Sequence, residues 1–234
     1  MIRWESAPGP YEVIFSTREG GVSEGPWASL NLGRKTGDEP ERVDENRRLL
    51  CAEAGADPDA LALNYQHHSA DVLRARPGAR DDRADGLWTD EPGLPVLALS
   101  ADCLPIVLAR ANGDRPALAV LHAGWRGLLA GIAESGVSAL GGGPVAAIVG
   151  PGIGPCCYDV GDEISAEFSR AFGEGLTREG RLDLWTAAEV ALRRAGCDAV
   201  ERLDLCTACA PERFFSHRRD RGITGRQGVI GLIR

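Results

Sequence analysis

The sequence is poor in histidine, with four among 234 residues, and it lacks any apolar run long enough to cross a bilayer. A spanning helix needs about 18 consecutive apolar residues, and the best candidate, Leu97–Ala109, is interrupted by Asp102. The first residues lack the apolar core of a signal peptide. We therefore expect a cytoplasmic protein that does not associate with membranes. The seven cysteines, an odd number in a chain too long for a disulfide-stapled miniprotein, are expected to be reduced there.

An excess of positive charge is also missing. The formal net charge of −8 provides no general attraction to nucleic acid or to anionic lipid. One basic cluster near the end, Arg218–Arg226 (RRDRGITGR), still allows a local anion site. Long apolar heptads are absent as well, so we predict a monomer. The length and the apolar content of 44% are those of a globular protein with a sizeable core.

Hydrophobic patterning predicts strands and helices in an irregular order. Strand-like runs cover residues 11–16, 71–75, 95–100, 104–109, 117–121, 145–149, 201–205 and 227–233. Helical patterns run from Pro40 to a stop at Gly55, from Trp125 through Ile132, and over 162–172 and 183–195. Residues 76–85 are predicted to form an exposed loop, and 150–163 a shaped loop rich in glycine and proline. Because strands and helices do not alternate strictly, we predict one α+β domain over residues 1–234, with mixed sheets and flanking helices.

Three apolar runs end in residues that can ligate a metal. They supply His68, Cys103 and His122, with His67 beside the first. Two imidazoles and one thiolate would bind zinc and leave a fourth position for water or substrate, as catalytic zinc sites do. The ligands are scattered along the chain, however, so a buried cysteine and unconnected histidines explain the pattern about as well.

A second interpretation needs no metal. Cys103 could act as a nucleophile with His122 or His68 as its base. Asp102 precedes the cysteine and could orient a histidine, or it could cap the turn.

The other clustered cysteines carry weaker signals. Cys206 and Cys209 form a lone CxxC pair, which cannot close a tetrahedral zinc site by itself. Cys156 and Cys157 are adjacent, and vicinal cysteines form a disulfide only with strain. We expect all four to pack or to shape loops.

A candidate anion contact lies one step into the turn that follows His122. Arg126 is near the start of a predicted helix, where the N-terminus favours negative charge. Arg218, Arg219 and Arg226 are alternatives. The glycines of 150–155 (GPGIGP) match neither the dinucleotide-binding nor the phosphate-loop pattern, so a turn forced by close backbone approach is the better explanation.

Motifs along almost the whole chain carry a family resemblance. They are FSTREGGVS (15–23), SLNLG (29–33), ENRR (45–48), QHHSADV (66–72), SADCLPI (100–106), HAGWRGLLAGI (122–132), GPGIGPCCYDVGDE (150–163), LDLW (182–185) and the segment from CTAC to TGRQ (206–227). In these motifs the chain resembles the YfiH family, long labelled multicopper polyphenol oxidases or laccase-domain proteins and later reassigned as purine nucleoside enzymes.

The resemblance implies a ligand set and several contacts. The family's zinc ligands fall on His68, Cys103 and His122. The family's valine before the first ligand is His67 here, which could compete as a ligand, although the register of the motif favours His68. Gln66 and Asn31 lie in matching motifs and are expected to bind substrate together with Arg126. Two aromatic positions of the family are replaced by Ala208 and His217, which puts the substrate preference in doubt.

The resemblance also implies an α+β sandwich that binds purine nucleosides and phosphate. Its implied activities are phosphorolysis of adenosine, inosine, guanosine and methylthioadenosine, and deamination of adenosine. We expect Cys103, His122 and Asp102 to be catalytic, with zinc activating water and Asp102 moving the proton. A laccase needs many imidazoles, which four histidines cannot supply, although one copper could replace zinc in the same site. The alternatives are a metal-independent Cys/His hydrolase and a zinc-bound binding protein without catalysis.

Overall fold

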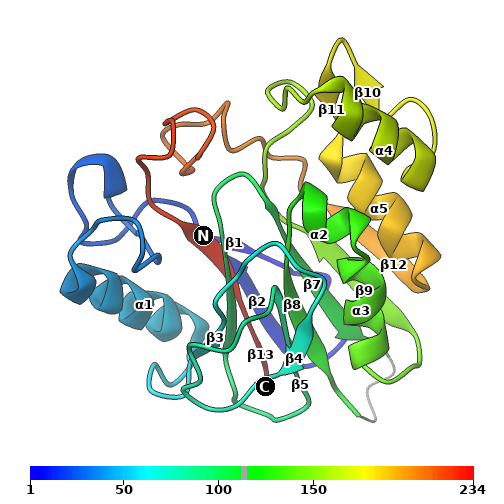
Figure 1. Cartoon of the computed structure of the whole chain (residues 1–234). Helices are drawn as coiled ribbons and strands as arrows, with labels where there is room; N and C mark the ends of the chain where they lie inside the picture. Colours follow the sequence, from blue (N-terminus) through cyan, green and yellow to red (C-terminus); the bar gives the residue numbers. More distant parts are fainter. Residues whose placement is uncertain (112–114) are drawn as a thin grey trace.

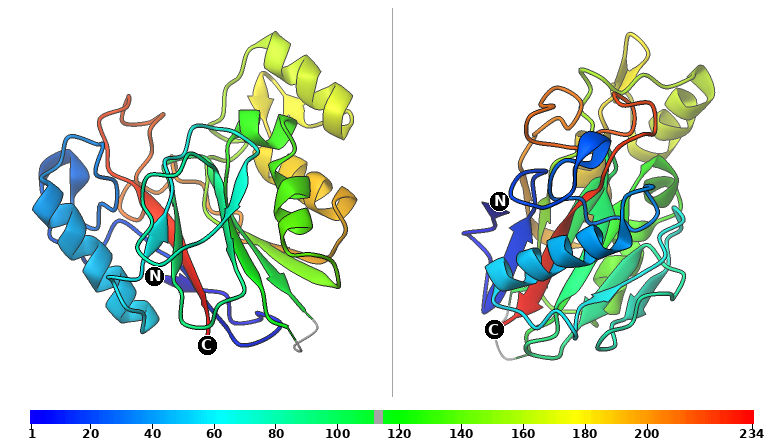
Figure 2. Two further views of the ribbon diagram at one scale, coloured as in Figure 1. Left: turned by 60° about the horizontal axis from the view of Figure 1, so that its bottom comes forward. Right: turned by 90° about the vertical axis from the view of Figure 1, so that its left-hand side faces the viewer.

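A computed structural model describes residues 1–111 and 115–234 of the chain. Two mixed β-sheets lie face to face, with one helix outside the first sheet and a group of helices outside the second (Figures 1 and 2). This arrangement confirms the expected α+β sandwich of mixed sheets with flanking helices. No helix within the described residues is long and apolar enough to span a membrane.

The first sheet has five strands and contains both ends of the described chain. Its order is β1 (Ile2–Arg3), β2 (Tyr11–Phe15), β13 (Gln227–Ile233), β6 (Val96–Ser100) and β3 (Ala62–Leu63). Neighbours are antiparallel except β3 and β6, which are parallel. The last strand of the chain, β13, therefore lies in the middle of the sheet, between two strands from the first half of the sequence.

The second sheet has six strands. Its order is β12 (Cys197–Arg202), β9 (Val145–Val149), β7 (Leu104–Arg110), β8 (Leu118–Ala123), β5 (Gly86–Thr89) and β4 (Val72–Arg74). The two outer pairs are parallel and the inner pairs antiparallel. Pro105 of β7 faces His122 of β8 in the register. The residues just before β7 and at the end of β8 therefore lie at the same edge of the sheet.

Apolar side chains fill three layers of this sandwich. Alternate residues such as Val13, Val107 and Val120 pack between the two sheets. Helix α1 (Pro40–Ala54) covers the outer face of the first sheet. The outer face of the second sheet packs against four helices, α2 (Trp125–Leu129), α3 (Ile132–Ala139), α4 (Asp162–Phe172) and α5 (Leu184–Arg194). A short 3-10 helix (Gly25–Trp27) and the β10–β11 hairpin (Thr177–Arg178 and Arg181–Leu182) are the remaining elements within residues 1–111 and 115–234.

Three local predictions are corrected by the structure. The strand predicted over 201–205 is β12 at Cys197–Arg202, because the backbone turns at Gly196 (φ +99°) directly after α5. Three of its six residues are exposed and only Cys197 is buried, which gives a weak hydrophobic pattern. The helical pattern after Trp125 is divided into α2 and α3 at Gly131, which has φ +91°. The loop predicted to be exposed over 76–85 ends in buried residues, with Asp85 only 2% exposed.

Candidate metal centre and cavity

The structure brings together the three ligands that the sequence predicted. The ligand atoms of His68, Cys103 and His122 all lie within 4.8 Å of one another. His68 comes from the segment between β3 and β4, Cys103 precedes β7, and His122 is in β8. The Cys103 Sγ is 3.8 Å from the His68 Nε2, and the two imidazole rings meet edge to face at 5.0 Å. Nitrogen and thiolate donors at these separations can share one metal ion.

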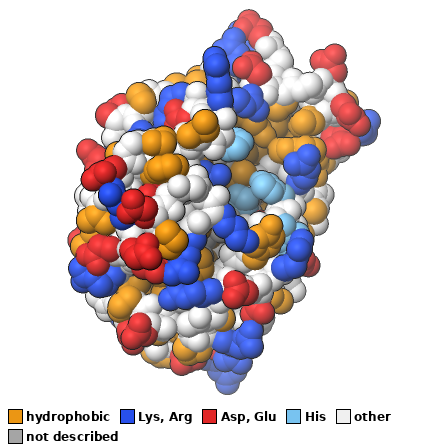
Figure 3. Space-filling view, turned by 60° about the vertical axis from the view of Figure 1, so that its left-hand side comes forward, with side chains coloured by type: hydrophobic (Ala, Val, Ile, Leu, Met, Phe, Trp, Pro, Cys, Tyr) orange, Lys and Arg blue, Asp and Glu red, His pale blue; other side chains and the backbone are white. Residues whose placement is uncertain are grey.

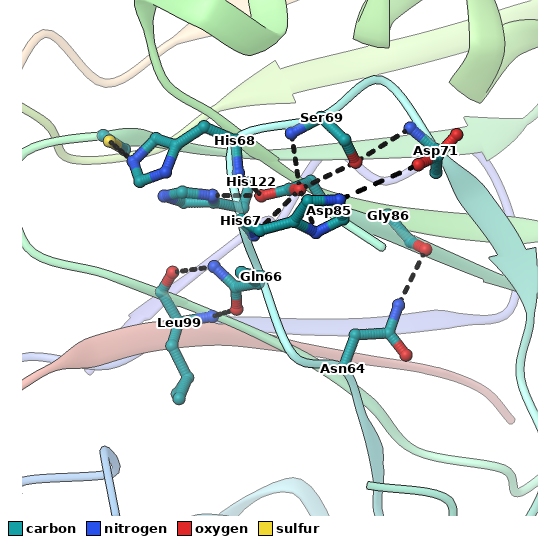
Figure 4. Close-up of polar contacts among 11 residues, drawn as sticks. Asn64, Gln66, His67, His68, Ser69, Asp71, Asp85, Gly86, Leu99 and His122 are labelled. Atoms are coloured by element: carbon teal, nitrogen blue, oxygen red, sulfur yellow. Dashed lines mark hydrogen bonds and ion pairs between the residues drawn. The ribbon is translucent and has the colours of Figure 1, made fainter. Parts of the chain in front are cut away.

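Asp85 orients two of these ligands. Its Oδ1 accepts hydrogen bonds from the His122 Nδ1 (2.8 Å) and the His68 backbone N–H (2.9 Å). Its Oδ2 accepts from the backbone N–H groups of Ser69 (2.7 Å) and His67 (3.1 Å), and from the Ser69 hydroxyl (Figure 4). Because an ionised carboxylate only accepts, the His122 Nδ1 carries a proton, and the Nε2 is the ring nitrogen that would ligate a metal after releasing its own proton. A carboxylate behind a ligating histidine is the usual arrangement at metal centres.

The charges in this cluster favour the ligating form of the cysteine. Burial raises the pKa of Cys103, but the charge of His122 and hydrogen bonds with both histidines outweigh it and lower the pKa to about 6. Burial lowers the pKa of His122, and the opposite effect of Cys103 and Asp85 raises it to about 9. Burial also raises the pKa of Asp85, yet its bond with His122 and the backbone N–H groups hold it well below the usual carboxyl range. The thiolate needed for a zinc or copper ligand is therefore the stable form at neutral pH.

Gly124 allows the turn after β8 to pass close to the ligands. A Cβ at this position would lie 2.9 Å from the Cys103 Sγ and 3.0 Å from the His68 ring. Any larger residue would push the cysteine or the histidine away from its partners. The sequence pattern His-Ala-Gly-Trp thus has a steric reason at its third position.

The three candidate ligands line a cavity of about 600 Å³. Figure 3 shows histidine side chains gathered in a hollow of one face, with lysine and arginine side chains beside it. Six basic residues line this cavity against two acidic ones, Asp81 and Asp102. The basic residues are Arg34, Lys35, Arg47, Arg80, Arg218 and Arg226. The cavity therefore has an excess of positive charge, although the whole chain is acidic.

Two of the other predicted site residues also line the cavity. The Gln66 side chain exchanges hydrogen bonds with the backbone of Leu99, through Nε2 (2.7 Å) and Oε1 (2.8 Å), which fixes its orientation. Asp102 is 8% exposed and accepts from the Thr207 hydroxyl and the Arg218 backbone N–H, both at 2.7 Å. Both residues are thus held in place by contacts outside the metal ligands.

Two predicted substrate contacts are not among the cavity-lining residues. Arg126 is exposed on α2, where its guanidinium lies 4.3 Å from the centre of the Trp125 ring. Asn31 is fully buried, and its Oδ1 accepts from the backbone N–H groups of Gly33 (3.0 Å) and Arg226 (2.8 Å). Asn31 therefore positions the backbone of two lining residues from behind the wall.

His67 lies outside the ligand cluster. Its Nδ1 is 3.5 Å from the Asp85 Oδ2, and the ligand group contains His68 instead. The turn at His68, with φ +65°, directs the two adjacent side chains differently. The geometry of the cluster therefore favours His68 over His67 as the candidate ligand.

Sequence reasoning missed Asp85 and most of the basic lining. Asp85 ends a polar segment that has no hydrophobic periodicity, so no local signal distinguishes it from its exposed neighbours. Arg47 was identified only as a helix residue, and Lys35 and Arg80 are in loops. Their convergence depends on the packing of α1 and the loops around the first sheet.

The fold and the site define a mixed α/β sandwich protein with a candidate metal centre of two histidines and one cysteine in a cationic cavity. The chain belongs to the family described as multi-copper polyphenol oxidoreductase laccase, whose model matches residues 12–234. It is 41% identical over 233 residues to a purine nucleoside phosphorylase of Deinococcus radiodurans, covering 94% of this chain and 88% of that one.

Two further comparisons support the family and the fold. The chain is 39% identical over 229 residues to the purine nucleoside phosphorylase YfiH of Escherichia coli, covering 93% of this chain and 92% of the relative. The crystal structure of YlmD from Geobacillus stearothermophilus superposes with a TM-score of 0.88 at 32% identity, covering 96% of this chain and 92% of that one.

Proposed function

We propose that this protein is a zinc-dependent purine nucleoside phosphorylase that also cleaves methylthioadenosine and deaminates adenosine. One observation carries the proposal: the candidate metal ligands and six basic side chains line the same cavity. The volume of about 600 Å³ is in the range of small-molecule sites. Relatives of similar length are named purine nucleoside phosphorylases. Copper is the alternative occupant of the metal centre, because nitrogen and sulfur donors also suit it.

Phosphorolysis assigns clear tasks to the residues of the cavity. A phosphate oxygen forms a bond to C1′ of the ribose while the bond from C1′ to N9 of the purine breaks, and the base leaves with the bonding electrons and takes up a proton. The arginines neutralise the phosphate charge and hold it in line with the breaking bond. Zinc on His68, Cys103 and His122 would supply Lewis-acid chemistry, which for deamination means activation of water. Asp102 is our proposed proton carrier.

Arg226 is the basic side chain that we expect to contribute most to phosphate binding. It lines the same cavity as Cys103 and Asp102, which supports this expectation. The Arg226→Met substitution keeps a buried aliphatic side chain of similar shape and removes the guanidinium charge. A charge-assisted hydrogen bond is worth about 1.5–3 kcal/mol, so the KM for phosphate should rise about 10- to 100-fold, with a smaller change in the KM for adenosine.

The matched control is Arg126→Met, because Arg126 is exposed and outside the cavity lining. Steady-state kinetics with each substrate varied in turn separates the two constants. A larger effect of the Arg126 substitution on phosphate would restore the sequence-based choice and contradict this assignment.

A metal analysis followed by incubation with adenosine tests the proposed function. We expect zinc in the purified protein, adenine and ribose 1-phosphate when phosphate is present, and inosine from the deamination. Chelation should abolish all turnover, and added zinc should restore it. A metal-loaded protein that converts no nucleoside under either condition would instead be the binding protein considered above.

The arrangement of Asp85, His122 and Cys103 favours a second candidate, a metal-independent hydrolase. The carboxylate orients the imidazole at 2.8 Å, and the imidazole faces a thiol with a pKa of about 6, as in cysteine nucleophile sites. This candidate retains full activity after chelation and loses it irreversibly with a thiol alkylator. The zinc proposal requires the opposite response to chelation.

A further inference from the structure

Four cysteines outside the cavity form a second cluster. The Sγ atoms of Cys156, Cys157, Cys206 and Cys209 all lie within 4.8 Å of one another. The Cys209 Sγ is 3.4 Å from both the Cys156 Sγ and the Cys157 Sγ. The two pairs are about 50 residues apart in the sequence, and the fold brings them into one cluster.

Backbone contacts explain how the two pairs meet. A β-bridge joins Gly152 to Cys206, and the Thr207 N–H donates to the Gly152 carbonyl at 3.1 Å. The Cys157 N–H donates to the Gly154 carbonyl at 2.9 Å, which closes a turn around the vicinal pair. Backbone hydrogen bonds alone therefore hold the loop after β9 against the turn after β12, without any bond that involves the sulfurs.

The spacing of the sulfurs suits a tetrahedral metal better than a disulfide. Zinc binds thiolates at about 2.3 Å, so the sulfurs of a regular tetrahedron lie about 3.8 Å apart. The two shortest sulfur–sulfur distances given above, 3.4 Å, lie below this value, and the 4.8 Å within which all four sulfurs lie is above it. A disulfide needs about 2.05 Å. Moreover, the Cys209 Sγ lies equally close to the Sγ atoms of Cys156 and Cys157. Ligands around a common metal ion have such equal separations, whereas a disulfide would bring one pair of sulfurs much closer than the other.

We propose that Cys156, Cys157, Cys206 and Cys209 bind one Zn²⁺ as a closed structural site. Four sulfur–zinc bonds form, and any thiol protons are released to solvent. The Gly154 N–H donates to the Cys206 Sγ at 3.3 Å, which supports a thiolate there. Cys156 and Cys209 are exposed, so an ion can enter from solvent. With all four positions taken by protein, this site has no place for substrate.

The site would stabilise one wall of the cavity. Ile153 and Tyr158, from the loop that carries the vicinal pair, line the cavity. Thr207, between the other two cysteines, donates to the Asp102 carboxylate. A metal that joins the two segments thus fixes groups on both sides of Asp102. The inference does not depend on which reaction the cavity performs.

Zinc content measured on protein purified with a non-metal-binding reductant tests the proposal. We expect two zinc ions per chain in the wild type and one in Cys209→Ser or Cys156→Ser. The His68→Ala/Cys103→Ala double variant should also retain one, with X-ray absorption showing four sulfur neighbours at about 2.3 Å. Cys197→Ser is the matched control, since Cys197 is a buried cysteine of β12 outside both clusters, and it should keep two.

Two results would overturn the second site. One is a double variant that is folded by circular dichroism but contains no zinc and takes up none when titrated with zinc. The other is a wild type that, denatured with chelator and without reductant, titrates five thiols instead of the seven in the sequence, because that loss indicates a disulfide. Neither readout involves nucleoside turnover, so failure of the proposed function leaves this test intact.

Discussion

Replacing Cys103 with alanine is expected to lower kcat/KM for adenosine phosphorolysis about a thousandfold. The substitution removes the one sulfur among the three candidate ligands. This sulfur, the Cys103 Sγ, lies 3.8 Å from the His68 Nε2. Lewis-acid stabilisation by a bound metal is worth several kcal/mol, about 4 here, and each 1.4 kcal/mol corresponds to a factor of ten. Deamination should fall in parallel. Steady-state kinetics and metal analysis on the same preparation measure both consequences.

The control for this variant is Cys197→Ala, which removes a buried thiol remote from the cavity. It should keep the metal content and the rates of the wild type within about a factor of two, as a substitution away from functional groups does. Phosphorolysis by a Cys103→Ala protein that contains no metal at this centre would refute the zinc-dependent mechanism. It would leave the role of the basic cavity open to a separate test.

Replacing Asp85 with asparagine is expected to weaken metal binding about 10- to 100-fold, the usual effect of losing a group behind a ligating histidine. Stability should fall as well. In asparagine one carboxylate oxygen is replaced by an NH₂ group, which donates and cannot accept. At the Oδ2 position this group would face the backbone N–H groups of His67 and Ser69. At the Oδ1 position it would face the His122 Nδ1 and the His68 N–H. An unpaired buried donor costs about 1–3 kcal/mol, so Tm should drop by about 2–12 °C.

Asp71→Asn is the matched control for this substitution. Asp71 lies just after the segment that carries His67 and His68, and its carboxylate is 4.0 Å from the His67 Nε2. Unlike Asp85, its side chain is 66% exposed. Zinc titration and thermal unfolding should both match the wild type. If the Asp85 variant keeps the wild-type zinc affinity, Asp85 does not orient the ligands. The metal-independent hydrolase would then also need another group to orient His122.

The elements that the sequence predicted well are those whose whole length is buried on one or both faces. β7, β9 and β13 are almost entirely buried, and their continuous apolar runs identify them. Helix α5 lies within the range 183–195 that its periodicity predicted, and it begins after Asp183, whose side chain accepts from the Thr186 N–H at 3.0 Å. The position predicted for β12 is wrong because only one of its six residues is buried, so its hydrophobic pattern is weak.

The candidate site was predicted in part for a similar reason. His68, Cys103 and His122 stand at the ends of apolar runs, and family motifs surround them, so local pattern and resemblance point to the same residues. Asp85 accepts hydrogen bonds from residues 16 to 37 positions away, and the Arg226 backbone N–H donates to Asn31, 195 positions away. Nothing in their immediate neighbourhood identifies those partners. The choice of Arg126 rested on its helix start, yet its side chain packs on Trp125 outside the cavity lining.

The sequence by itself therefore determined the mixed α+β class and the extent of the buried elements, because these depend on local periodicity. It also indicated the three candidate ligands, through the ends of apolar runs together with the family motifs around them. Only the tertiary structure decided which carboxylate orients His122, which basic residues line the cavity, and that two pairs of cysteines form one cluster. These properties arise from strand order and loop packing. Segments such as 150–158 and 206–209 become neighbours only when β9 and β12 pair in the second sheet.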